Sequence, residues 1–307
     1  MNISKTLMTG LSILAAGFLV GCGESDSASV SSADEVEVLF NGKDLTGWSG
    51  NPENWSVVDG TIVGTTTDEN PLPYNQFLIY QGDPVEDFEL AAELKLTSDG
   101  NNSGIQYRAQ LRPDLGDHVV SGYQCDMHPF VWANGMLYDE KGRAILAKRG
   151  MKVVITPEGK AMQVGDLGEE PEFNTGEWST YKITARGNHL VHEVNGVQTV
   201  DVYDHQEAER EESGVIAFQI HKGPAMKVEI RNVTLKRLPR SGLTAPEATP
   251  VPADAKPVNP PKPKAAPKEK GKEKGKEKGK EKGKEKGKEK GKAPGKAKAA
   301  VPEKPKA

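Results

Sequence analysis

Amide, charged and imidazole side chains recur at every second position in three short stretches of the sequence, residues 104–110, 122–128 and 214–221. Alternate residues of an extended strand lie on the same face, so each stretch has one apolar face and one polar face. A sheet face that meets only solvent is usually rich in Lys, Glu and Thr, whereas these faces combine amides with ionisable groups. This pattern favours a hydrogen-bonding surface for a polyhydroxylated ligand, formed by Gln106, Arg108, Gln110, Gln124, Asp126, His128, Gln219 and His221.

Three of these residues, Asp126, His221 and Arg108, form an ionisable set suited to proton transfer and to stabilising negative charge. A protein that only binds its ligand needs amides and aromatics more than a base, so the set favours an enzyme. Asp126 and His221 also allow a second interpretation, a structural hydrogen bond. The sequence has no G-x-S-x-G elbow, no H-E-x-x-H motif and no phosphate-binding glycine loop. Serine-hydrolase, zinc-protease and nucleotide chemistry therefore lack support.

The polar faces belong to a region, 36–238, whose hydrophobic periodicity is two. Its clearest strand runs from Phe88 to Leu96, and turn signals such as Asn195-Gly196 punctuate the region. No ten-residue amphipathic helix interrupts the series. Many strands and few helices predict an all-β fold, an antiparallel sandwich or jelly roll. Further strands are expected at 62–66, 104–110, 120–127, 152–156, 181–186, 189–194, 214–220 and 227–235.

Two more residues bear on the function. Cys125 lies on an apolar face and is predicted to be a buried thiol rather than a nucleophile. Trp132 stands in the polar, glycine-containing stretch 128–135 and is the tryptophan best placed to stack on a ligand. We therefore include Trp132, but not Cys125, among the candidate binding residues.

The first 22 of the 307 residues predict export. They contain one early lysine, an apolar run of about fourteen residues and a Leu-Val-Gly-Cys ending, and that run is short for a bilayer span of roughly twenty residues. The ending resembles a bacterial lipobox, which predicts lipidation of Cys22 and anchoring to the cell envelope, in the periplasm or at the surface. An ordinary signal peptide with an incidental cysteine is the alternative. Residues 23–35 form a polar tether.

The C-terminal segment, 239–307, is predicted to be a disordered tail rich in Pro, Ala and Lys. Residues 268–291 are six copies of Lys-Glu-Lys-Gly, and the glycine of each repeat opposes a helix by about 1 kcal/mol. Residues 241–307 hold 20 Lys and 9 acidic residues, a net charge of +11, whereas residues 1–240 carry −15. The tail is then a spacer or a tether to anionic envelope polymers. The acidic body argues against a nucleic-acid partner.

Short motifs spread over about 38–238 resemble, in chain order, a bacterial family named 3-keto-disaccharide hydrolase, long known as a domain of unknown function. The first motif is Leu39-Phe40-Asn41-Gly42-Lys43-Asp44-Leu45-Thr46-Gly47-Trp48. Later ones are Asn102-Ser103-Gly104-Ile105 with Arg108, Gly122-Tyr123-Gln124 with Asp126, Leu137-Tyr138-Asp139-Glu140 with Arg143, Gln219 with His221, and Arg231-Asn232-Val233. The resemblance implies a concanavalin A-like jelly roll that holds a sugar on its concave sheet.

The resemblance also implies a reaction, the cleavage of a glycoside oxidised at C3. A C3 ketone makes the C2 proton acidic, so a base can remove it and the glycosidic oxygen can leave from C1, with water adding afterwards. The enzyme would be a 3-keto-glycoside hydrolase, with lyase-type chemistry as a variant. We predict His221 or Asp126 as the base and Arg108 as the partner of the ketone or enolate. Binding and acid candidates are Glu93, Gln106, Gln124, Tyr138, Glu140, Arg143, Gln219 and Trp132.

Three alternatives stay open at this stage. A divalent metal held by Asp126, Glu93 and His221 would be a second way to stabilise an enolate, although no cofactor is certain. A lectin-like module would bind glycans on the same fold without cleaving them. An envelope scaffold would depend on the Lys-rich tail instead of the sandwich.

Overall fold

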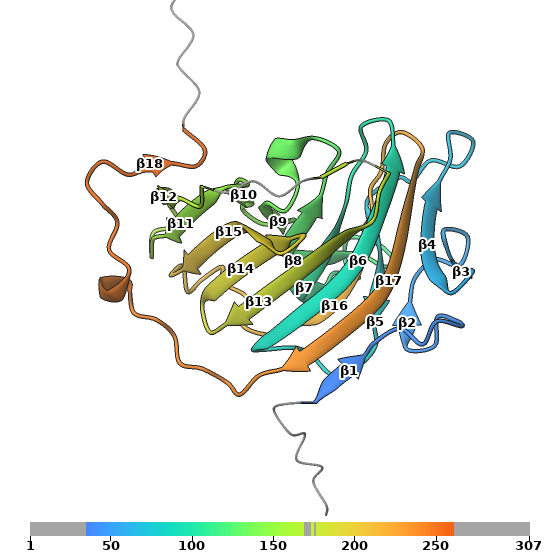
Figure 1. Cartoon of the computed structure of the whole chain (residues 1–307), viewed down its shortest axis with the longest axis horizontal. Helices are drawn as coiled ribbons and strands as arrows, with labels where there is room; N and C mark the ends of the chain where they lie inside the picture. Colours follow the sequence, from blue (N-terminus) through green and yellow to red (C-terminus); the bar gives the residue numbers. More distant parts are fainter. Residues whose placement is uncertain (1–34, 169–172, 175, 261–307) are drawn as a thin grey trace, which may run out of the picture. The chain divides into compact units, whose positions relative to one another are not determined.

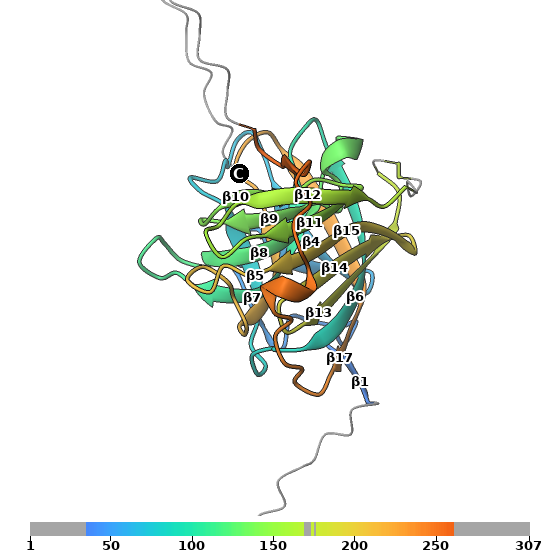
Figure 2. The same cartoon turned by 90° about the vertical axis from the view of Figure 1, so that its left-hand side faces the viewer.

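The computed structural model describes residues 35–168, 173–174 and 176–260, and it is an all-β sandwich of two sheets (Figures 1 and 2). The larger sheet has 11 strands. Its order is β18 (Lys256–Pro257), β12 (Ala161–Asp166), β11 (Met151–Ile155), β15 (Val197–Asp204), β14 (His189–Val194), β13 (Ser179–Arg186), β6 (Phe88–Ser98), β17 (Met226–Arg237), β4 (Thr61–Thr66) and β3 (Trp55–Val58), with β1 (Val36–Val38) also paired to β17.

The smaller sheet has seven strands. Its order is β10 (Ala144–Ala147), β9 (Leu137–Glu140), β8 (Val120–Met127), β7 (Ser103–Leu111), β16 (Val215–Ile220), β5 (Gln76–Tyr80) and β2 (Trp48–Ser49). Every named strand pair is antiparallel except β11 with β15. Within the described ranges the helical segments are two single 3₁₀ turns, Val131–Ala133 and Pro246–Ala248. The predicted all-β jelly-roll class is confirmed.

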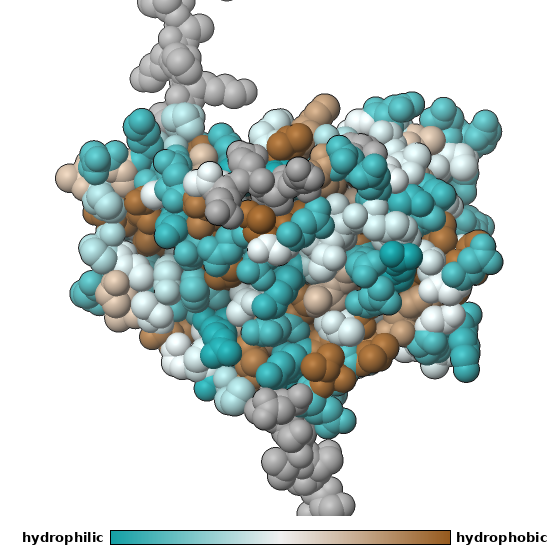
Figure 3. Space-filling view, viewed as in Figure 1, coloured by the Kyte–Doolittle hydropathy of each residue, from teal (hydrophilic) through white to brown (hydrophobic). Residues whose placement is uncertain are grey.

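The core lies between the two sheets because each central strand buries every second side chain. Strand β6 alternates buried and half-buried residues from Phe88 to Leu96, and its apolar side chains meet Tyr107, Tyr123 and Phe218 from the smaller sheet in one cluster. Cys125 belongs to that cluster, with no exposed surface, as predicted. The outer face of the larger sheet is mostly hydrophilic (Figure 3) and carries ion pairs such as Lys95 with Glu229.

A bulge in β7 places Arg108 on the opposite face of the sheet from the one we predicted. The β7 register shifts between Tyr107 and Gln110, and Arg108 has a φ of 47°. An extra residue in a strand moves the following side chains to the opposite face. Ala109 therefore packs on the outer face with Phe77, while the Arg108 side chain is 1% exposed and pairs with Asp87.

The folded unit extends past residue 238, where we predicted a disordered tail to begin. Residues 239–260 pack against the sandwich instead of forming a disordered tail. Ser241 donates its backbone N–H to Asp87 Oδ2 over 2.6 Å, and the Val258 side chain, 2% exposed, joins the core cluster. Strand β18 pairs with β12. The segment belongs to the domain because its hydrogen bonds and its one buried valine fix it to the sandwich, although it has few apolar residues.

Several predicted features lie outside the described residues. They are the signal segment with Cys22, all of the tether except residue 35, and the Lys-Glu-Lys-Gly repeats. In the part of the chain that is described, no helix is long and apolar enough to cross a membrane.

Candidate active site

A polar cavity of about 250 Å³ opens on the outer face of the smaller sheet. Antiparallel neighbours bring the end of one strand beside the start of the next, so the ends of β8 and β16 lie with the starts of β7 and β5 at one edge. Side chains that are far apart in sequence therefore meet there. The lining residues are Asn75, Asn102, Gln124, Asp126, His128, Met136, Tyr138, Glu140, Lys141, Gln219 and His221.

Three glutamine side chains form the floor of this cavity. Gln106 Nε2 donates to Gln124 Oε1 over 2.8 Å, and Gln124 Nε2 donates to Asp126 Oδ1 over 2.5 Å. Gln219 Oε1 lies 3.4 Å from the same Gln124 nitrogen. Gly104, which pairs with Asp126 across the two strands, must lack a side chain. A Cβ at Gly104 would lie 2.7 Å from Gln124 Cγ. The floor thus holds Asp126 in one orientation by a chain of buried amides.

Asp126 is the most strongly perturbed acid of the cavity. The residue is 3% exposed, and burial, together with the nearby Glu140, raises its pKa to about 8 against the lowering effect of the Gln124 hydrogen bond. The group therefore keeps its proton at neutral pH. Because Oδ1 accepts from Gln124, the proton belongs on Oδ2, where it can be donated to a ligand.

The two cavity histidines are held in opposite tautomers. His221 Nδ1 lies 2.5 Å from the Lys222 carbonyl oxygen, which can only accept, so Nδ1 carries the proton and Nε2 has a free lone pair. His128 Nδ1 lies 3.1 Å from the backbone N–H of Phe130, which can only donate, so the proton of neutral His128 sits on Nε2. Burial lowers the pKa of both imidazoles. Both rings are thus neutral at pH 7, one a base and the other a donor.

Glu140 and its neighbours complete the polar wall. Lys141 Nζ lies 2.7 Å from Glu140 Oε1, and Asn75 Nδ2 donates to the same oxygen over 3.2 Å. Burial, with Glu140 close by, raises the pKa of Tyr138, so its hydroxyl keeps its proton. These groups can hold sugar hydroxyls by donating and accepting hydrogen bonds.

Of the predicted site residues, the structure brings His221, Asp126, Gln124, Tyr138, Glu140 and Gln219 to the cavity, with Gln106 beneath them. Three predictions are wrong. Arg108 lies inside the sandwich, where its Nε also donates to the Glu86 carbonyl. Glu93 lies on β6 of the other sheet, in an ion pair with Arg231 at 2.7 Å. Arg143 is tied to Asp139 and Asp204, at 2.7 and 2.8 Å, over the ring of the core residue Tyr123.

Five lining residues had no predicted catalytic or binding role, although His128 was placed on the polar face: Asn75, Asn102, His128, Met136 and Lys141. His128 had a signal, since it follows Asp126 at the strand period of two. Asn75 had none, because β5 was not predicted. Trp132 lies beside the cavity rather than in its lining, with its ring centroid 6.2 Å from that of His128.

The predicted metal set is not assembled, because Glu93 lies in the opposite sheet from Asp126. Among the described residues, no group of three His, Cys, Asp or Glu side chains is placed to hold a metal ion.

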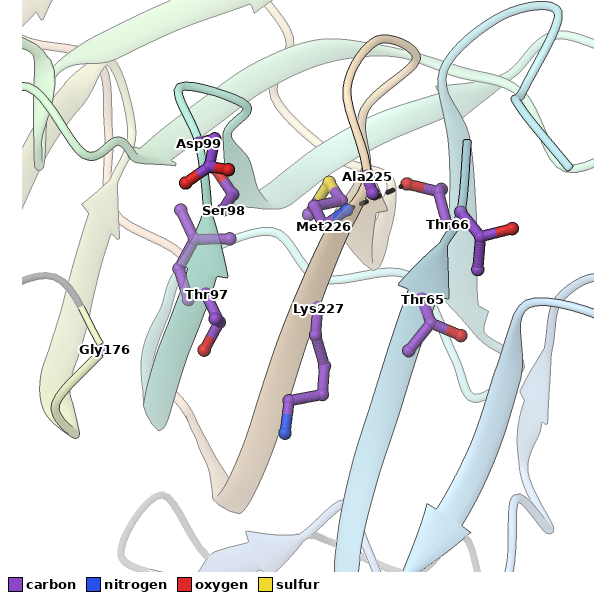
Figure 4. A pocket seen from close by; sticks show the side chains of 11 residues that line it. Thr65, Thr66, Thr97, Ser98, Asp99, Gly176, Ala225, Met226 and Lys227 are labelled. Atoms are coloured by element: carbon purple, nitrogen blue, oxygen red, sulfur yellow. Dashed lines mark hydrogen bonds between the residues drawn. The ribbon is translucent and has the colours of Figure 1, made fainter. Parts of the chain in front are cut away.

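A larger hollow of about 470 Å³ lies over the ends of β4, β6 and β17 (Figure 4). Five of its eleven lining residues are Thr or Ser, and Lys227 points away from Asp99. The hydrogen bond drawn across it, from the Met226 N–H to Thr66 Oγ1, joins two strands. The hollow therefore lacks the converging ionisable groups of the smaller cavity, which remains the better candidate site.

The cavity on this β-sandwich brings together amides, a carboxyl that keeps its proton and two imidazoles, groups that can donate hydrogen bonds to sugar hydroxyls and accept them. Residues 35–236 match the model of the 3-keto-α-glucoside-1,2-lyase-like domain. The chain belongs to that family, as the sequence motifs predicted.

Several solved structures are similar to this chain at low identity. A candidate glycosyl hydrolase from Parabacteroides distasonis is 22% identical, with a TM-score of 0.45 over 67% of this chain and 96% of that one. The carbohydrate-binding module CBM66 of Bacillus subtilis is 11% identical, with a TM-score of 0.44 over 62% and 95%. A galectin-like protein of Bacillus subtilis is 10% identical, with a TM-score of 0.45 over 67% and 96%. Comparison with curated proteins gives no match.

Proposed function

We propose that the protein cleaves 3-keto-glycosides by elimination across C1 and C2, followed by hydration. The observation that carries the proposal is the pairing of a basic imidazole nitrogen, His221 Nε2, with a carboxyl that stays protonated, Asp126, in one cavity. A reaction through an enolate needs both a base for the carbon acid and a donor for the developing oxyanion.

The first step transfers a proton from carbon to nitrogen. His221 Nε2 takes the C2 proton, and the C–H electron pair moves toward the C3 oxygen to form the enolate. The Asp126 carboxyl donates a hydrogen bond to that oxygen. A neutral buried carboxyl in this role has a precedent in ketosteroid isomerase. Asp126 thus replaces Arg108 as the enolate partner.

The second step expels the leaving group. The enolate re-forms the ketone, the C1–C2 double bond forms, and the C1–O bond breaks with its electrons on the departing oxygen. The products are a 2-hydroxy-3-keto-glycal and an alcohol, which ends with a proton equivalent to the one His221 took. Addition of water across the double bond gives the free 3-keto sugar, so the sum of both stages is hydrolysis without any redox change.

The test compares 3-keto-glucosides with the parent glucosides, and the wild type with His221→Gln. Release of the alcohol from the keto series alone, with turnover lowered by about 10²–10⁴ in the variant, supports the proposal. Glutamine occupies a similar volume but cannot accept a proton. Cleavage of the parent glucosides at equal rates contradicts it. Saturable glycan binding without any cleavage would favour the lectin alternative.

Export and lipid anchoring through Cys22 form part of the same proposal, supported by the signal-like segment and the lipobox-like ending. Metabolic labelling with a radioactive fatty acid tests it. The wild type should carry the label and Cys22→Ser should not, while an unlabelled wild type would contradict lipidation.

A further inference from the structure

The 3₁₀ turn Val131–Ala133 presents apolar side chains to solvent beside the cavity. Phe130 and Trp132 are each 54% exposed. Among the large hydrophobic residues that are exposed in the described part of the chain, these two are the only aromatic ones. Single exposed aliphatic residues are ordinary on protein surfaces, but these two exposed aromatic rings both lie near His128, a residue of the cavity wall, and offer a surface on which a flat ligand can stack.

This aromatic turn is held rigidly by the sandwich beneath it. The buried Asn134 Oδ1 accepts from the His128 N–H at 3.2 Å and from the Tyr181 hydroxyl at 2.7 Å. The Gly135 N–H donates to the Asp126 carbonyl over 2.7 Å. The backbone that carries the two aromatic residues therefore keeps a defined position relative to Asp126, which favours a preorganised subsite.

His128 links the turn to the reacting groups. Its ring centroid lies 5.0 Å from that of Phe130 and 6.2 Å from that of Trp132, and its side chain lines the cavity. The backbone N–H of Phe130 occupies Nδ1, so the same turn that exposes the aromatic rings also places the His128 proton on Nε2.

We infer that His128, Phe130 and Trp132 form the leaving-group subsite and that it favours aromatic, phenol-type leaving groups. The inference rests on the proposed function and names its substrate class. A flat apolar ring can stack on Phe130 and Trp132, while His128 Nε2–H points a hydrogen bond at the departing oxygen.

The chemistry of a neutral imidazole narrows the choice of leaving group. Full transfer of the Nε2 proton would leave an imidazolate, so His128 stabilises the departing oxygen by a hydrogen bond and does not protonate it. Neutral histidine acts in this way in triosephosphate isomerase. The oxygen therefore leaves as an anion. A phenolate is a far weaker base than an alkoxide and is therefore a far better leaving group. The phenolate takes its proton from solvent, and His221 returns one to solvent, so protons balance.

The test uses the full chain with 4-nitrophenyl, phenyl and methyl 3-keto-β-glucosides and their α anomers. The wild type should show kcat/KM at least tenfold higher for the aryl compounds. Trp132→Ala should raise KM for aryl substrates about tenfold and leave the methyl substrate unchanged. Leu111→Ala, which removes an exposed apolar side chain from the same sheet, should change neither. His128→Ala should slow the phenyl substrate more than the nitrophenyl one, and His128→Gln, which keeps an N–H donor, should restore part of the loss.

Equal effects of Trp132→Ala on aryl and methyl substrates would overturn the inference. So would loss of binding to phosphatidylglycerol vesicles in that variant with aglycone preference unchanged, since the turn would then contact a membrane. If the wild type cleaves no keto-glycoside, the proposed function fails separately. Fluorescence titration with the aryl and methyl compounds then decides the subsite alone, because an aryl preference that depends on Trp132 supports it and equal affinities refute it.

Discussion

Replacing Asp126 by asparagine should stabilise the folded protein at neutral pH while slowing the reaction. The wild-type carboxyl has a pKa of about 8 in the folded state, against 3.8 for an ordinary aspartate. Between these values the unfolded chain releases a proton that the folded chain keeps, so stability falls as pH rises, by about 1.4 kcal/mol per pH unit. The accumulated loss at pH 7 is about 4 kcal/mol. Asparagine is similar in shape, has no proton to lose and can still accept from Gln124.

Denaturant unfolding of both proteins at several values between about pH 4 and pH 8 measures this effect. The free energy of unfolding should be similar at the acid end, and the advantage of Asp126→Asn should grow to about 4 kcal/mol at pH 7. Asp114→Asn is the control, because Arg112 lowers the pKa of that exposed carboxyl. As pH rises, the free energy of unfolding of the wild type should increase relative to that of this control variant. Turnover of Asp126→Asn should fall by about 10²–10³.

A difference between Asp126→Asn and the wild type that stays constant over this pH range would refute the reasoning. It would mean that the carboxyl is ionised in the folded state at neutral pH. An ionised Asp126 could not donate to an enolate oxygen, so the result would refute both the raised pKa and the role assigned to Asp126.

Arg108→Ala should lower the free energy of unfolding by about 3–5 kcal/mol, since it leaves a buried partner charge unpaired. Kinetics below the melting range should show a nearly unchanged kcat. A large rate loss in a stable variant would contradict the structural role. Ending the chain after Arg240 should cost about 3–5 kcal/mol relative to ending it after Pro260, because the removed segment buries a valine and makes several hydrogen bonds; equal melting temperatures in calorimetry would show that this segment does not belong to the domain. The turnover rate should fall on the acid side below pH 6.5 as His221 becomes protonated, since burial lowers its pKa. It should also fall on the alkaline side near pH 8 as Asp126 ionises. A profile that is flat between pH 5 and 9 would exclude the roles of both residues.

Much of the smaller sheet's outer face could be predicted because a strand's period of two assigns faces locally. Gln124 and Asp126 reached the cavity as expected, and Gln219 and His221 did so from a strand almost a hundred residues away. The same local argument found the core face and the buried Cys125. Family motifs added the class of reaction, which no periodicity contains.

The errors arose where a side chain's position depends on partners distant in sequence. One extra residue in β7 turned Arg108 into the sandwich, where Asp87 neutralises it. Glu93 obeyed its strand period correctly but belongs to the other sheet, and only strand pairing decides sheet membership.

The amino-acid sequence by itself determined the strand pattern, the core face, the family and the polar faces from which a site could be built. The tertiary structure alone decided which of those groups meet, that Asp126 is buried enough to stay protonated, and that Phe130 sets the tautomer of His128. The reason is physical. Strand periodicity is a property of neighbouring residues, whereas desolvation and hydrogen bonding depend on every atom that packing brings close.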